Sequence, residues 1–267
     1  MGACLQKPVL SAIVERHGSK SFRVGMAELN GWRSSMEDAH VIHVADDWGF
    51  FGVLDGHGGA ECSAWCAQRL HEKLDAEGCP ADDGAAKKMV LAVDQEFLDT
   101  QQSSGSTAAM CIVRPPAKAG GKWLLHVINA GDSRVLLSRA DGTIVDGGGT
   151  DAGLSTDHKP DYPSEKERIY RSVARARQSE RERERERERE SMISTIHATP
   201  PHITHRCDGE GAERACARMR RCGGTVEETA GGCARVNGDL AVSRGFGDAD
   251  YKQTGGPGPE DRPVLGV

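Results

Sequence analysis

The pattern of hydrophobic and polar positions predicts a hairpin, two helices and further strands. Residues 39–45 alternate as a strand, and an apolar strand over 48–54 follows after an Asp-Asp turn, which is typical of an antiparallel hairpin. Apolar residues then recur at helical spacing over 60–78 and over 85–100. Further strands are predicted at 22–29, 105–114, 122–129, 135–139, 224–228 and 233–236. This order favours an α+β fold with antiparallel sheets over βαβ repeats.

The apolar run at 50–54 ends in Asp55, Gly56 and His57. A strand that ends in this way presents Asp55 at the rim of a sheet, where glycine lets a ligand approach the backbone closely. A hard cation would accept the Asp55 carboxylate and the Gly56 carbonyl together, because Mg²⁺, Mn²⁺ and Ca²⁺ prefer oxygen ligands. The alternative is an ordinary turn, since Asp-Gly is a strong turn signal.

A second acidic cluster precedes the first strand of the hairpin and favours the metal interpretation. Glu37 and Asp38 are adjacent, and Arg33 lies four residues before Glu37. These residues and Asp55 can converge at one end of a sheet. Such an arrangement offers carboxylates for metals and an arginine fork for a phosphate.

Six ordered blocks resemble the type 2C metal-dependent protein Ser/Thr phosphatases, the PPM family. The blocks are 31–40, 52–59, 104–108, 129–134, 157–160 and 236–244. The resemblance covers most of 1–169 and 223–255. It implies an α-β-β-α sandwich, in which two antiparallel sheets are flanked by helices and the metals lie at one end of the sheets. We expect residues 1–20 to be an N-terminal extension and 21–267 to be the phosphatase-like domain.

The resemblance implies a two-metal site for Mg²⁺ or Mn²⁺. Asp55 would bridge the two ions, with Glu37 and the Gly56 carbonyl serving one of them. Asp38 would orient a metal-bound water or act as a ligand itself. Asp157 matches an acid of a further, weaker metal site, although its local sequence equally favours a cap of the turn before a proline.

The same resemblance implies hydrolysis of phosphoserine or phosphothreonine by a metal-activated water. Arg33 would bind the phosphate oxygens, and His57 would protonate the leaving alkoxide. The alternative for His57 is a histidine bonded to a turn backbone. For Asp132, in the Asn-Ala-Gly-Asp-Ser-Arg block, a structural turn is favoured over catalysis.

The chain departs from the family pattern at residues 170–222, an insertion that follows a helix predicted to begin at 163–169. Within it, 181–190 is a strict alternation of Arg and Glu with no apolar stripe. We expect a solvated helix or a disordered loop there. The rest of the insertion holds histidines and cysteines whose spacings fit no zinc-finger pattern.

Two further acids of the family's catalytic centre do not appear after Tyr251. We therefore expect one metal here rather than two, exposed sheet edges and an uncovered core face. Three hypotheses follow. The chain is an active phosphatase, or it is a phosphatase-like protein that binds phosphoprotein or a partner without turnover, or it is a fragment without a stable fold.

Composition adds limits on partners and compartment. The formal net charge of −6 argues against general nucleic-acid binding, and no apolar run approaches 18 residues. The nine cysteines are irregularly spaced, which indicates reduced thiols in a cytoplasmic or nuclear protein, and we expect a monomer that acts on phosphoproteins. Gly2 after Met1 is suited to N-myristoylation and Cys4 to palmitoylation, which would add weak membrane association; the alternative is a disordered start.

Overall fold

The computed structural model describes residues 4–197, 225–229 and 232–252. The chain divides into two compact units. The first is formed mainly by residues 1–158 and 244–249, and the second by 159–243 and 250–265. The candidate site belongs to the first unit.

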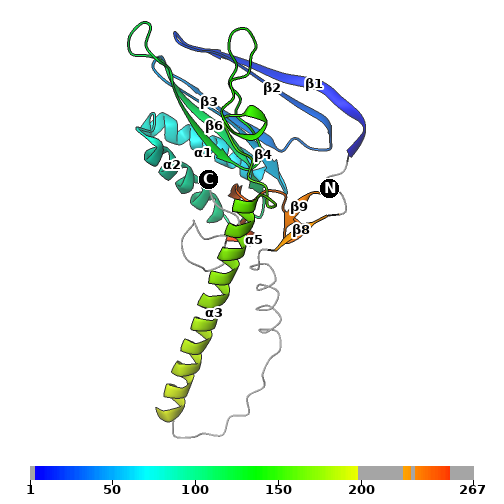
Figure 1. Cartoon of the computed structure of the whole chain (residues 1–267), viewed down its shortest axis with the longest axis vertical. Helices are drawn as coiled ribbons and strands as arrows, with labels where there is room; N and C mark the ends of the chain where they lie inside the picture. Colours follow the sequence, from blue (N-terminus) through cyan, green and yellow to red (C-terminus); the bar gives the residue numbers. More distant parts are fainter. Residues whose placement is uncertain (1–3, 198–224, 230–231, 253–267) are drawn as a thin grey trace. The chain divides into compact units, whose positions relative to one another are not determined.

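The first unit is built on a six-stranded antiparallel sheet (Figure 1). Its strands are β3 (Asp38–Val44), β4 (Gly49–His57), β5 (Gly105–Ser106), β6 (Ala108–Arg114), β7 (Leu124–Ala130) and β10 (Phe246–Gly247). Five of the strands lie in the order β10-β5-β4-β6-β7, and the sixth, β3, also pairs with β4. The predicted hairpin is therefore confirmed, with β4 at the centre of the sheet.

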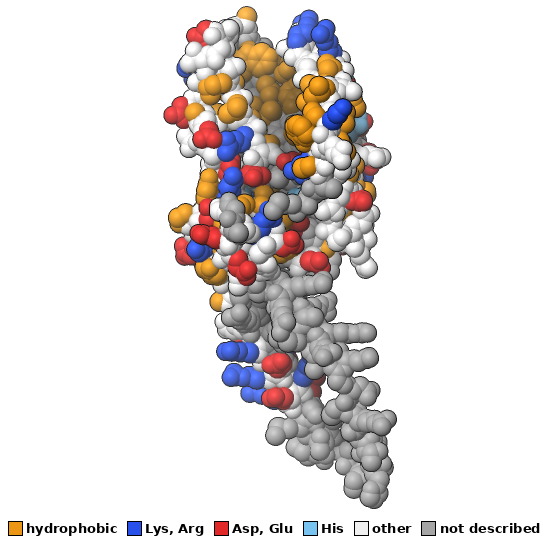
Figure 2. Space-filling view, turned by 90° about the vertical axis from the view of Figure 1, so that its right-hand side faces the viewer, with side chains coloured by type: hydrophobic (Ala, Val, Ile, Leu, Met, Phe, Trp, Pro, Cys, Tyr) orange, Lys and Arg blue, Asp and Glu red, His pale blue; other side chains and the backbone are white. Residues whose placement is uncertain are grey.

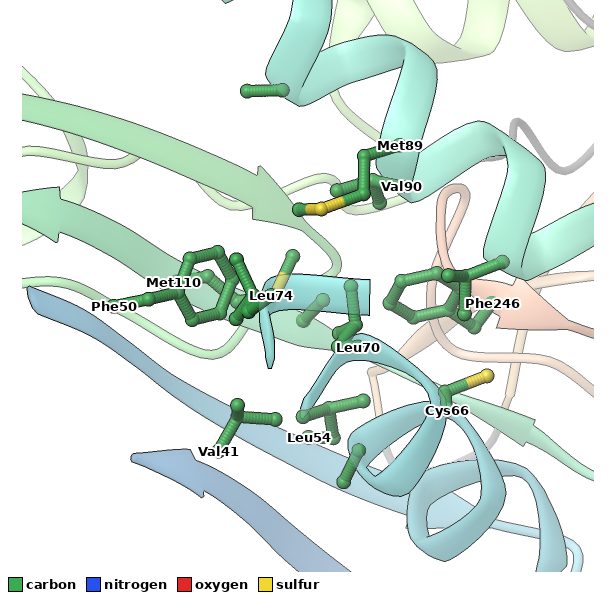
Figure 3. Packing of buried hydrophobic residues seen from close by; sticks show 14 of the residues in the cluster. Val41, Phe50, Leu54, Cys66, Leu70, Leu74, Met89, Val90, Met110 and Phe246 are labelled. Atoms are coloured by element: carbon green, nitrogen blue, oxygen red, sulfur yellow. The ribbon is translucent and has the colours of Figure 1, made fainter. Parts of the chain in front are cut away.

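Two helices, α1 (Glu61–Glu77) and α2 (Asp83–Leu98), pack on this sheet. Figure 3 shows their apolar side chains meeting those of the strands. The largest buried contributors to this core include Phe50, Leu54, Leu70, Leu74, Val90, Phe97, Met110 and Phe246. The Asp82 carboxylate caps α2 by accepting the Ala85 N–H at 2.8 Å, which explains where that helix begins. Cys62 and Cys66, four residues apart, are buried positions of α1.

Residues 4–18 form a strand rather than a disordered start. β1 (Cys4–Gly18) pairs antiparallel with β2 (Arg23–Arg33), with register shifts between Cys4 and Ala12. Most of the β1 side chains are exposed. The sequence of β1 therefore shows no clear alternation of apolar and polar residues. Backbone pairing with β2, rather than burial of side chains, holds this strand in place.

Two predicted strands of the first unit differ in detail. Residues 105–114 are divided into two strands. β5 pairs with β4 and β10, whereas β6 pairs with β4 and β7. Residues 135–139 form no continuous strand. They make a single bridge, Ser138 to Ile144, around a turn at Asp141 and Gly142, where the Gly142 N–H donates to the Arg139 carbonyl at 3.0 Å.

The second unit contains α3 (Pro163–His197) and a two-stranded sheet of β8 (Val226–Glu228) and β9 (Ala234–Val236). Short turns of helix occur at η1 (Thr150–Ala152), in the first unit, and α5 (Ala249–Lys252). A small core of Ile169, Val236, Leu240 and Val242 holds the second unit together. Of the two expectations for residues 181–190, the solvated helix is the one observed, with every side chain exposed.

Large hydrophobic side chains remain exposed on the first unit, and Figure 2 shows such side chains gathered in the part of the surface drawn at the top. The exposed large hydrophobic residues of the first unit include Val9, Leu10, Ile13, Val14, Leu29, Trp32, Val53, Trp123, Leu124, Leu136, Leu137 and Ile144. Among the described residues, no helix combines the length and the hydrophobicity that crossing a bilayer requires.

Candidate metal and phosphate site

The β3–β4 hairpin brings the two acidic clusters of the sequence together. Asp38 and Asp55 are directly opposite each other in the register of the two strands. The Gly56 N–H donates to the Glu37 carbonyl at 3.1 Å, and the Ser63 hydroxyl at the start of α1 donates to the same carbonyl at 2.5 Å. These bonds hold the backbone that carries Glu37 against the end of β4.

Glycine at position 56 is required by this packing. A Cβ atom there would lie 2.2 Å from the Glu37 carbonyl oxygen and 2.8 Å from the Ser63 hydroxyl. Any side chain would therefore push the Glu37 segment away from Asp55. The sequence predicted a close backbone approach at this glycine, and the approach that the structure shows is that of Glu37.

A pocket of about 200 Å³ connects the acids with the predicted phosphate-binding arginine. Its lining residues are Leu29, Asn30, Arg33, Ser34, Ser35, Met36, Glu37, Asp38, Asp55 and Gly56. The Ser35 hydroxyl donates to the Glu37 carboxylate at 3.1 Å, and the Asn30 amide donates to the Arg33 carbonyl at 2.5 Å. Five residues that the sequence selected, Arg33, Glu37, Asp38, Asp55 and Gly56, therefore share one pocket.

The electrostatics of this pocket favour a cation. Burial raises the pKa of Asp55, and the negative charges of Asp38 and Asp132 and a hydrogen bond with Asp38 raise it further, while His57 lowers it. A bound cation would relieve this repulsion. The metal-ligand atoms that the pocket offers are carboxylate and carbonyl oxygens, which are the ligands that Mg²⁺, Mn²⁺ and Ca²⁺ prefer. The residues present thus fit a hard divalent ion.

Hydrogen bonds from β6 and its neighbours fix the position of Asp55. The Asp55 N–H donates to the Thr107 hydroxyl at 3.2 Å, and the Thr107 N–H donates to the Asp55 carbonyl at 2.9 Å. The Thr107 hydroxyl also bonds the Ser133 hydroxyl at 2.6 Å. The blocks at 104–108 and 129–134 therefore support the backbone of the candidate metal ligand.

His57 is bonded to a carboxylate rather than to a turn backbone. Its Nε2 lies 2.8 Å from Oδ1 of Asp248, whose side chain is only 4% exposed. The other oxygen, Oδ2 of Asp248, is buried and has no hydrogen-bond partner in the described part of the chain. Burial lowers the pKa of His57, but the hydrogen bond and charge of Asp248, with Asp55 and Asp132, outweigh it, so that the pKa is raised overall.

Asp157 lies apart from the pocket and already has a cationic partner. Its side chain is 1% exposed and accepts two bonds from the Arg134 guanidinium, both at 2.8 Å. Its own N–H donates to the Thr150 hydroxyl at 2.9 Å. Asp157 is not among the residues that line the pocket. A metal ion at Asp157 would have to compete with Arg134, so its role in a weaker metal site stays a prediction.

Sequence reasoning missed Asp248 and underrated Asp132. Asp248 stands 191 residues after His57, and no local spacing can pair residues across that distance. The available signal was the block around 237–252, which resembles the family beyond its core motif. Asp132, assigned to a structural turn, is close enough for its charge to raise the pKa of Asp55.

The predicted lipidation site is described only in part. Gly2 lies outside the described residues, and Cys4 is exposed at the start of β1. The histidines and cysteines of the insertion also lie outside the residues whose side chains are described. Lipidation of Gly2 and Cys4 stays a prediction.

Comparison with known proteins gives one consistent result. A family model described as protein phosphatase 2C matches residues 22–187 and 212–264. Protein phosphatase 1B of Mus musculus is 29% identical over 290 residues, which cover 99% of this chain and 56% of the mouse protein. Protein phosphatase 1A of Homo sapiens is 27% identical over 285 residues, again covering 99% and 56%. The chain thus spans about half the length of the curated relatives it matches.

Solved structures agree on the fold. A phosphatase from a pathogenic strain of Toxoplasma gondii aligns with a TM-score of 0.55 at 20% identity, covering 98% of this chain and 71% of that one. A second phosphatase structure from Toxoplasma gondii aligns with a TM-score of 0.52 at 16% identity, over 87% of this chain and 62% of that one. The predicted mixed α+β fold with antiparallel sheets is therefore confirmed.

Proposed function

Because the chain belongs to the protein phosphatase 2C family, we propose that it is a metal-dependent phosphatase acting on phosphoserine and phosphothreonine of proteins. The observation that supports this most directly is the pocket in which Arg33 shares a lining with Glu37, Asp38 and Asp55. An arginine beside clustered carboxylates is suited to holding a phosphate next to a divalent cation.

The cation would be held by oxygen atoms of the hairpin. Its ligands would be the carboxylates of Glu37, Asp38 and Asp55 and the carbonyl of Gly56. When bound, Mg²⁺ or Mn²⁺ supplies an activated water as nucleophile and neutralises negative charge on the phosphate. The Asp38–Asp55 pairing across β3 and β4 keeps two of these carboxylates together before any ion arrives, so little reorganisation is needed.

Arg33 would bind the phosphate group of the substrate. Its side chain is exposed at the end of β2, on the lining of the pocket. A guanidinium can donate two parallel hydrogen bonds to phosphate oxygens and remains charged at all relevant pH values. An exposed arginine at a pocket edge suits a phosphate carried on a protein, because the substrate backbone then stays outside the pocket.

His57 would protonate the leaving hydroxyl oxygen of serine or threonine. Its side chain is 30% exposed, so one side of the ring can face substrate while Nε2 is bonded to Asp248. The Asp248 carboxylate orients the ring and stabilises its protonated form, leaving Nδ1 as the nitrogen that can donate. General acid catalysis of this kind contributes about 10² to 10⁴ in rate.

The test is hydrolysis of a phosphothreonine peptide by the full chain with millimolar-scale Mn²⁺. We expect phosphate release that depends on the metal and is lost in Asp55→Asn, a nearly isosteric change that removes the carboxylate charge. Circular dichroism of both proteins establishes that each is folded. A folded wild-type chain that releases no phosphate but binds the phosphopeptide would overturn the proposal in favour of a non-catalytic binder.

A further inference from the structure

A second cluster of potential metal ligands lies outside the pocket. It consists of His43 on β3 and of His71 and Asp75 on α1. One ligand atom from each residue lies within 4.8 Å of the other two. His43 Nδ1 is 3.2 Å from Asp75 Oδ1, and His71 Nε2 is 3.6 Å from Asp75 Oδ2.

Packing of α1 on β3 brings these side chains together. Val41 and His43 are two residues apart and therefore share one face of β3, and Val41 is buried in the core with Leu70 and Leu74 of α1. His71 and Asp75 each follow one of these leucines, and their spacing of four residues places them on one side of the helix. The cluster thus sits at the border of the core.

The ring of His43 is held in a fixed orientation. It stacks on Trp48 with the ring centroids 4.4 Å apart and 15° between the planes. Its side chain is 18% exposed, whereas those of His71 and Asp75 are 51% and 57% exposed. One ligand is therefore preorganised, and the other two are free to close on an ion that arrives from solvent.

We propose that His43, His71 and Asp75 form a binding site for Zn²⁺, with water as the fourth ligand. Two imidazoles and one carboxylate are a ligand set that suits Zn²⁺ and other late transition-metal ions rather than Mg²⁺. Ligand atoms around a tetrahedral Zn²⁺ stand about 3.4 Å apart, so the exposed side chains need to move by roughly 1.5 Å or less. The bound ion would join β3 to α1 and stabilise the fold.

This site is distinct from the oxygen-rich pocket and does not rest on the proposed function. Asp38 and His43 lie at the two ends of β3, five residues and therefore about 17 Å apart along the strand. The two sets of ligands also differ in chemistry, since the pocket offers oxygen atoms and the cluster two nitrogens. Excess Mg²⁺ can therefore occupy the pocket without filling the cluster.

The test is competition for Zn²⁺ between the full chain and a chromogenic chelator, with Mg²⁺ in large excess. We expect His71→Ala to weaken one Zn²⁺ site by more than about tenfold, and Asp75→Asn to weaken the same site. Zn²⁺ should also raise the melting temperature of the wild type but not of His71→Ala. Co²⁺ in place of Zn²⁺ should give visible d–d absorption that His71→Ala removes.

The matched control is His17→Ala. His17 is also an exposed histidine beside a carboxylate, with Nε2 at 3.0 Å from Glu15, but it is outside the cluster. The chain has ten histidines and nine cysteines, and those outside the cluster can also bind Zn²⁺. The decisive result is therefore the difference between the variants and not the total amount of Zn²⁺ bound. Unchanged Zn²⁺ binding in both His71→Ala and Asp75→Asn, or an equal loss in His17→Ala, would overturn the proposal.

Discussion

At the scale of single residues, the pairing of His57 with Asp248 depends on a glycine behind it. A Cβ atom on Gly105 would lie 2.2 Å from Asp248 Oδ1 and 2.3 Å from His57 Nε2. Asp248 itself has a φ of 55°, a left-handed conformation that is unfavourable for most residues and that asparagine tolerates. Such strain is retained where the surrounding structure imposes it, and it is frequent at functional sites.

The leaving group of the substrate provides a test of this pair. We expect His57→Ala and Asp248→Asn to lower kcat for a phosphothreonine peptide by about 10²-fold or more. The loss with p-nitrophenyl phosphate should be much smaller, because p-nitrophenolate leaves without being protonated. Steady-state kinetics with both substrates at saturating Mn²⁺ give the two ratios.

Asp250→Asn is the matched control, since it makes the same change at an exposed position two residues later. It should leave both rates unchanged. Equal losses with the two substrates in Asp248→Asn would contradict a role of Asp248 in orienting the acid, and would indicate a general structural defect instead.

At the scale of elements, the short strand β10 carries the residues that lead into Asp248. Its two residues pair with β5, and Phe246 is fully buried in the core. The Gly247 N–H donates to the Asp94 carboxylate of α2 at 2.8 Å, and the Asp94 side chain is buried. Helix α2 thus anchors β10, because the pairing of only two residues with β5 would not hold this strand in position.

Removing this anchor should reduce stability. We expect Asp94→Ala to lower the free energy of unfolding by about 1–3 kcal/mol, because it leaves a buried N–H without its acceptor. Urea denaturation followed by circular dichroism measures the change. The control is Asp99→Ala, at the exposed C-terminal end of the same helix, with an expected effect within about 0.5 kcal/mol. Similar losses in the two variants would show that the bond to Gly247 is not the cause.

At the scale of the whole molecule, the first unit gathers carboxylates at one end of its central sheet. Burial raises the pKa of Asp55 there, and repulsion from the negative charges of Asp38 and Asp132 raises it further. Folding without a cation therefore proceeds against this repulsion. A cation that bound these carboxylates only in the folded chain would therefore stabilise it, and the proposed function and the stability would depend on the same residues.

This linkage predicts a metal-dependent melting temperature. At Mg²⁺ concentrations about a hundred times Kd, the gain is about 2.7 kcal/mol, which corresponds to a rise of several degrees. Asp55→Asn should abolish the rise while leaving the metal-free protein as stable as the wild type or more so. Differential scanning fluorimetry with and without Mg²⁺ measures both effects.

Asp47→Asn serves as the control, because Asp47 is an exposed acid at the opposite end of the same hairpin. It should retain the full Mg²⁺ effect. A rise of equal size in Asp55→Asn would mean that Mg²⁺ stabilises the chain elsewhere.

The sequence by itself determined the elements whose cause is local. The β3–β4 hairpin follows from apolar residues at every second position, and α1 and α2 follow from apolar residues at every third or fourth position. Both patterns can be seen within a short stretch of sequence. The acids at the ends of that hairpin were found for the same reason, since a hairpin places Asp38 opposite Asp55 once its turn is known.

Only the tertiary structure decided the contacts that close long loops. Asp248 reaches His57 because β10 joins β5, and His71 and Asp75 reach His43 because α1 packs on β3. The pairing of β1 with β2 likewise depends on the backbone rather than on an apolar pattern. Such contacts leave no periodic signal, because the free energy that forms them comes from burial and hydrogen bonding between distant segments rather than from neighbouring residues.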